Sequence, residues 1–76
     1  MFKTNELTSP ISCLNKAQDD EMIFVLLGRD PAAPMAIREW VERRIEMGKN
    51  SRTDIQIIEA QNCADYMEQN RKRWTK

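Results

Sequence analysis

The chain has 76 residues, the length of one small domain, so its core is small and a metal, a disulfide or a second subunit commonly stabilises such a protein. Its 12 basic and 12 acidic residues cancel. Proteins that coat nucleic acid or membranes without specificity have a strong basic excess, so the balance argues against that class. It has no histidine, and its two cysteines, Cys13 and Cys63, fit neither the usual four-ligand zinc site nor a disulfide framework, so we predict free, buried thiols and no cofactor.

The first residues are polar and lack periodicity, so we predict a flexible N-terminus over 1–8 and a single small helical domain over 9–76. Ser9 followed by Pro10 is typical of an N-cap and a first helical position, which predicts a short helix from Pro10 to about Ala17. No signal-peptide core or membrane span is present, so we expect a cytoplasmic protein without membrane contact.

Met22–Leu27 is an unbroken apolar run, preceded by acidic residues and followed by Gly28. The pattern is compatible with a buried strand or a short buried helix. We favour the helix, because no second strand candidate is present to pair with a lone strand. The strand remains the alternative if another subunit supplies a partner. Both interpretations place this central segment in the core.

Asp30-Pro31 repeats the cap-and-proline signature and opens the clearest helix, which Gly48 ends. An apolar stripe runs along one face of this helix: Ile37, Trp40, Val41 and Ile45. Charged residues cover the opposite face. The pattern predicts one half of an antiparallel helical hairpin.

Ser51 with Asp54 resembles a capping box and predicts a last helix from Arg52 to about Arg73. This helix has a main apolar stripe (Ile57, Ala60, Ala64 and Met67) and a second apolar side (Ile55, Ile58 and Tyr66). Two apolar sides require two packing partners. One is the preceding helix, and we expect the other to be a second copy, giving a homo-oligomer that is a dimer or larger. The fold class is therefore mainly α: a short N-terminal helix, a buried central segment and a two-helix antiparallel hairpin.

Enzymatic chemistry is poorly supported, because the usual general base, histidine, is absent and neither cysteine has a base nearby in sequence. The polar stretch before the last helix instead suggests an anion site, since free backbone N–H groups and the helix dipole favour a phosphate there. The residues assigned to it are Lys49, Asn50, Ser51, Arg52 and Thr53, with Arg29 and Arg38 as further cations and Trp40 and Tyr66 as stacking residues. An ordinary capped turn explains the same stretch, and Asp54 would repel an anion.

The basic C-terminus combines Arg71, Lys72 and Arg73 with Trp74, a mixture that can bind nucleic acid. Cations are also favoured at a helix C-terminus, and we prefer that structural interpretation. Nucleic acid is thus not an expected partner. A small nucleic-acid-associated regulator is kept only as a second alternative function.

An acidic pair, an FVL-like apolar run, the sequence Asp-Pro-Ala-Ala-Pro and a helix with Trp40 follow one another in this chain. Over roughly residues 9–70 it resembles a family of small phage- and prophage-encoded proteins without a settled activity. The resemblance implies an accessory phage protein that acts against host defence inside the infected bacterium. We expect it to sequester a nucleotide-type immune signal. A protein–protein inhibitor of a host defence or CRISPR enzyme is the alternative.

Overall fold

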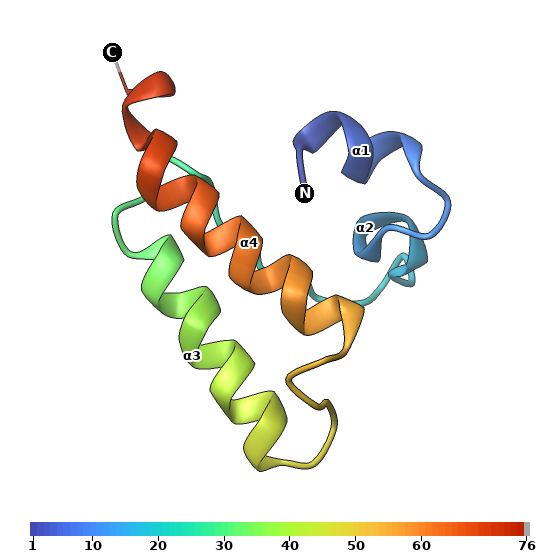
Figure 1. Ribbon diagram of the computed structural model, residues 1–76. Helices are drawn as coiled ribbons and strands as arrows, with labels where there is room; N and C mark the ends of the chain where they lie inside the picture. The colour runs from blue at the N-terminus through green and yellow to red at the C-terminus, as the bar shows by residue number, and fades with distance from the viewer. Residues whose placement is uncertain (76) are drawn as a thin grey trace.

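The computed structural model describes residues 1–75 as a helical protein with α1 (Lys3–Thr8), α2 (Cys13–Lys16), α3 (Ala33–Glu46), α4 (Ile55–Asn70) and a terminal 3-10 turn, η1 (Arg71–Arg73). Helices α3 and α4 pack side by side as an antiparallel hairpin, and α1 and α2 lie on the other side of α4 (Figure 1). Residues 1–75 contain no strand. The predicted mainly α fold with a helical hairpin is confirmed.

Helix α3 starts close to its predicted signal. The Asp30 carboxylate accepts a hydrogen bond from the Ala32 N–H at 2.9 Å, and the Asp30 carbonyl accepts one from Ala33. This turn directs the chain into the helix, which begins at Ala33 with a proline in its first turn. The predicted end is confirmed: Gly48 has φ +70, a left-handed conformation that glycine adopts without strain.

The core lies between α3 and α4. Val41 and Ile57 are its largest apolar side chains, and Ala33 and Ala64 are buried beside them. Small residues at a helix contact allow the two backbones to approach closely, which suits a short hairpin. The predicted stripes are partly confirmed, because Val41, Ile57 and Ala64 are buried whereas Trp40 remains 42% exposed. On the second apolar side of α4, Ile55 is 76% exposed.

Helix α4 begins at Ile55, three positions after the predicted Arg52, and Asp54 is its N-cap. The backbone first forms a turn in which the Asp54 N–H bonds to the Ser51 carbonyl at 3.2 Å. Ser51 therefore belongs to the turn, and the expected capping box is wrong. Regular α-helix ends at Asn70, and the remaining predicted turn, to Arg73, is the 3-10 turn η1.

The N-terminal region also differs from the prediction. Ser9-Pro10 ends helix α1 instead of starting a helix, because a residue before proline is disfavoured in the α conformation, and Ser9 is extended (φ −79, ψ 125). The next helix is only Cys13–Lys16, and its N-cap is Ser12, whose hydroxyl accepts from the Asn15 N–H at 3.2 Å. Helix α1 covers most of residues 1–8, for which no helix was predicted.

Hydrogen bonds hold α1 and α2 together without a buried apolar residue in either helix. The Asn15 side-chain amide donates to the carbonyl groups of Glu6, Leu7 and Ser9 at 2.8–3.1 Å. Buried Ser12 donates to the Glu6 carbonyl at 2.6 Å, and a Glu6 carboxylate oxygen accepts from the Leu14 N–H at 2.8 Å.

The prediction of a buried helix or strand over residues 22–27 is wrong, because this segment forms neither element and lies largely on the surface. Met22 is 95% exposed and Phe24 is 88% exposed. The space between α3 and α4 is already filled by other side chains, so the fold has no room to bury this segment there. No helix in residues 1–75 is long and apolar enough to cross a membrane.

Candidate functional site

An apolar groove of about 390 Å³ lies between the central segment and α3. The residues that line it are Phe24, Leu26, Ala36, Ile37 and Trp40. Helix α3 supplies three of them from the face beside its contact with α4. Arg44 lies over the Trp40 ring, with its guanidinium carbon 5.7 Å from the ring centroid, a cation–π arrangement.

The predicted anion-binding stretch lies in the turn between α3 and α4, where carboxylates already occupy its donors. Asp54 accepts hydrogen bonds from the Ser51 N–H (3.0 Å), the Ser51 hydroxyl (3.0 Å) and the Asn50 amide (2.9 Å). These bonds, with that from Asn50 the strongest, lower the pKa of Asp54. The Thr53 hydroxyl lies 3.1 Å from that of Ser51, and the side-chain Oδ1 of Asn50 accepts from Arg44 at 2.7 Å.

Arg52 points back to α3, where its two terminal nitrogens contact the two carboxylate oxygens of Glu42 at 3.0 and 3.2 Å. This paired hydrogen bond, with the charge attraction added, lowers the pKa of Glu42 and raises that of Arg52. Arg52 therefore fastens the turn to α3. Lys49 is exposed, and none of the ion pairs among residues 1–75 includes it.

The other two predicted cations lie away from this turn. Arg38 joins α3 to the later part of α4, with 2.8 Å contacts to Asp65 and Glu68, and the Glu68 hydrogen bond is the main cause of its raised pKa. Arg29 precedes α3, at the opposite end of that helix from the inter-helix turn, and is exposed. Within one copy, the structure therefore does not bring Arg29 or Arg38 to Lys49 and Arg52.

The two predicted stacking residues also occupy different places. Trp40 is in the groove, whereas Tyr66 belongs to an aromatic cluster on α4 with Phe2 and Trp74. Phe2 meets the Tyr66 ring edge-on with centroids 5.5 Å apart, and Trp74 lies 6.0 Å away. The Tyr66 hydroxyl accepts a hydrogen bond from Arg73 at 2.6 Å, so both its ring and its hydroxyl are engaged.

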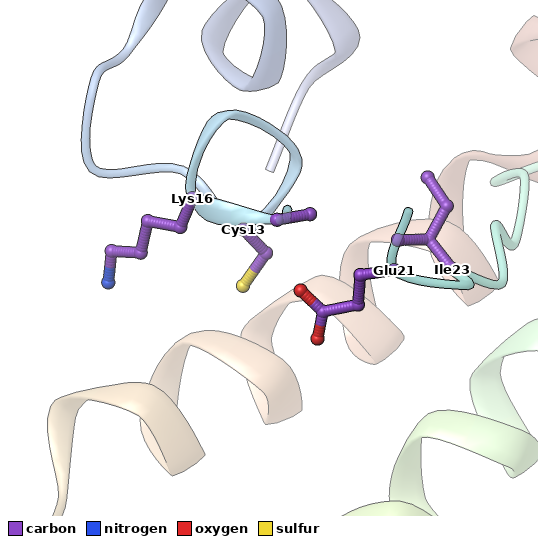
Figure 2. Close-up of a pocket in the computed structure, with 5 residues that line it drawn as sticks. Cys13, Lys16, Glu21 and Ile23 are labelled. Atoms are coloured by element: carbon purple, nitrogen blue, oxygen red, sulfur yellow. The ribbon is translucent and has the colours of Figure 1, made fainter. Parts of the chain in front are cut away.

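A second, more open hollow of about 340 Å³ lies between α2 and the start of the central segment. Figure 2 shows the Cys13 sulfur and the Glu21 carboxylate directed into it from opposite sides, while the Lys16 amine points away. Both thiols are free, as predicted, but the predicted burial is wrong, because Cys13 is exposed and Cys63 only half-buried. Among residues 1–75, no group of three or more acidic or cysteine side chains is placed to hold a metal ion.

Sequence reasoning identified Trp40 and the apolar run but did not join them into one site. The sequence did not predict that the run is exposed, because six consecutive apolar residues are ordinarily buried. Phe2 was also missed, because it lies in a segment without apolar periodicity. No protein family matches this chain, and comparison with curated proteins and with solved structures gives no match either.

Proposed function

We propose that the chain is a non-catalytic binding protein that contacts a partner protein through the groove beside Trp40 and the exposed central segment. The single observation that carries this proposal is the exposure of Phe24, at 88%, directly beside Trp40. Continuous exposed apolar surface is uncommon on monomeric proteins and marks interaction sites. Aromatic residues in a pocket are also the usual centres of binding energy in protein interfaces.

The surroundings of the groove suit a protein partner better than a small anion. Its lining is apolar, and the cation over its Trp40 ring, Arg44, also donates to the Asn50 side chain. A protein surface would bury the aromatic rings, while Arg44 would remain at the polar rim. Burying Phe24 and Met22 alone would contribute roughly 1.5–3 kcal/mol each to association.

Sequestration of a nucleotide signal stays a prediction with weaker support. A phosphate at the inter-helix turn would have to displace Asp54 from Ser51 and Glu42 from Arg52. Those carboxylates repel an anion, and the net charge of zero gives no long-range attraction. The resemblance to phage accessory proteins makes a bacterial defence protein the first class of partner to test.

Site-specific photo-crosslinking tests the proposal. A benzophenone amino acid replaces Phe24 in the full chain, and irradiation in bacterial cells should give one dominant adduct with a second protein. The matched control places the same probe at Ile55, which is 76% exposed on α4. It should not give that adduct.

The identified protein is then purified, and its affinity for variants of the chain is measured. Phe24→Ser and Trp40→Ala should each weaken binding by roughly 30-fold, the effect of a typical hot-spot residue of about 2 kcal/mol. Ile55→Ser should leave the affinity unchanged. Equal affinity of all three variants would overturn the proposal. So would the absence of a protein adduct together with a nucleotide that raises the melting temperature equally in the parent chain and in the Phe24→Ser variant.

A further inference from the structure

Few contacts attach the central segment to the helices. In the stretch from residue 18 to residue 32, Leu26 and Gly28 are partly buried and every other residue is exposed. Hydrogen bonds of 3.0 Å close one turn over residues 18–21 and another over residues 27–30. Because both turns are local, they shape the stretch but do not fix it to a helix. Its position in the molecule therefore depends chiefly on Leu26 and Gly28.

The two partly buried residues contact different elements. Leu26 lines the groove against α3. Gly28 lies under the indole ring of Trp74, so close that a Cβ at position 28 would be 2.8–3.3 Å from three carbons of the six-membered ring. Figure 1 shows the chain crossing behind the C-terminal turns of α4 before it enters α3. Trp74 thus joins the end of the chain to the end of the central segment.

Trp74 is itself held in a defined place. Its N–H bonds to the Arg71 carbonyl at 3.2 Å, which closes η1. Its ring lies 6.0 Å from the ring of Tyr66, and Arg73 donates a hydrogen bond to the Tyr66 hydroxyl at 2.6 Å. Tyr66 therefore anchors both the indole and the turn that carries it. Trp74 is partly buried, although the residues on either side of it are exposed.

We propose that Trp74 is a positioning residue for the groove: its contact with Gly28 keeps the groove-lining part of the central segment against α3. Gly28 follows Leu26 by two residues, so a displacement of Gly28 also displaces Leu26. Without the indole, Leu26 would be the main attachment of the segment, and local opening requires little free energy where few buried contacts hold a segment. The use of the groove for binding rests on the proposed function, whereas its positioning by Trp74 is a property of the free chain.

The fluorescence of Trp40 tests this role, because Trp40 lines the groove and is 42% exposed. The chain has two tryptophans, so Trp40 is the only one in the Trp74→Phe and Trp74→Ser variants. Phenylalanine keeps an aromatic ring at position 74, whereas serine removes the ring that covers Gly28. Acrylamide should quench Trp40 with a Stern–Volmer constant about 1.5-fold higher or more in Trp74→Ser than in Trp74→Phe, because the Trp40 indole loses the cover of the central segment.

Two further substitutions, each made in the Trp74→Phe chain, separate this effect from a general loss of stability. Gly28→Val disturbs the same contact from its other side and should raise the quenching constant to a similar extent. Ser12→Ala removes a buried hydroxyl that donates to the Glu6 carbonyl at 2.6 Å, on the opposite side of α4 from α3, and should leave the quenching constant unchanged. Circular dichroism checks that each compared variant is folded, and Gly28→Val decides the question if Trp74→Ser is not.

The quenching measurement needs no partner, so its failure is distinct from a failure of the proposed function. Equal quenching constants in Trp74→Phe and in the variants that disturb the contact would overturn the positioning role. An increase with Ser12→Ala as large as that with Gly28→Val would overturn it as well, because the groove would then respond to any loss of stability. Absence of a protein adduct at Phe24, with the expected quenching, would contradict the proposed function and leave the role of Trp74 supported.

Discussion

Replacing Gly28 with alanine would place a methyl group against the indole ring of Trp74. A Cβ at position 28 lies 2.8 Å from Cζ3 of that ring and 3.2 and 3.3 Å from Cε3 and Cη2. Ordinary carbon–carbon contacts are about 3.5–4.0 Å, so the ring has to move. Trp74 is held by its tilted contact with Tyr66, at 6.0 Å between centroids, and a shift would disturb that contact.

Two effects of opposite sign determine how much Gly28→Ala changes the free energy of unfolding. Overpacking at a fixed ring costs about 1–3 kcal/mol. The φ angle of Gly28 is not positive, so alanine fits the backbone and should stabilise the fold by about 0.4–1 kcal/mol through the unfolded chain. We expect Gly28→Ala to lower the free energy of unfolding by about 1 kcal/mol, or the melting temperature by about 4–8 °C for a domain of this size.

Trp74→Leu supplies the decisive comparison, because it removes the ring that the new methyl group would meet. In that background, Gly28→Ala should raise the free energy of unfolding instead of lowering it. Urea unfolding followed by circular dichroism measures all four members of the cycle. If Gly28→Ala has the same effect with and without Trp74, the contact between these residues does not constrain the fold and the reasoning is refuted.

Further predictions concern the hairpin. Ile57→Ala, at a side chain that is 2% exposed, should lower the free energy of unfolding by about 2–5 kcal/mol and leave the chain largely unfolded in mild urea. Gly48→Ala should cost about 1 kcal/mol in the same assay, because a residue with a Cβ is strained at φ +70. The pKa values of Glu42 and Asp54 are lowered in the folded chain, so their contribution to stability is present at neutral pH. It should be lost as the pH falls below their ordinary values of 4.5 and 3.8.

Conservative variants control these predictions. Ile58→Ala changes a neighbouring exposed isoleucine and should have a much smaller effect than Ile57→Ala. Gly48→Asn, which tolerates the left-handed conformation, should be milder than Gly48→Ala. Glu42→Gln combined with Asp54→Asn should flatten the acid limb of the stability profile, and an unchanged profile would mean that other carboxylates control it.

The helical hairpin was accessible from sequence because local signals and packing agreed there. Asp30 and Gly48 mark turns that depend on neighbouring residues only, and the stripe through Val41 follows from helix periodicity. The start of α4 was not accessible in the same way. Ser51 and Asp54 are both suitable N-cap residues, and the sequence does not say which of them begins the helix. The structure selects Asp54, whose carboxylate accepts hydrogen bonds from Ser51 and Asn50 within the turn.

The candidate groove was missed for a different physical reason. An apolar run such as Met22–Leu27 predicts burial only if the fold leaves space for it, and sequence periodicity does not report how much space remains. Here Ala33, Val41, Ile57 and Ala64 already form the buried core. The anion site was assigned from residue type and from the expected helix start, and the sequence did not reveal that Glu42 faces Arg52 across the hairpin.

The hydrogen bonds that the Asn15 side-chain amide donates to the carbonyl groups of Glu6, Leu7 and Ser9 bear on the rate of folding. All these partners lie within nine residues of Asn15, and α3 and α4 are consecutive in the chain, so each of the two helix pairs joins elements that are neighbours in sequence. Helical proteins of low contact order fold in about microseconds to milliseconds. A slower refolding phase whose rate increases with protein concentration would therefore report the meeting of two chains, after each had already formed its helices.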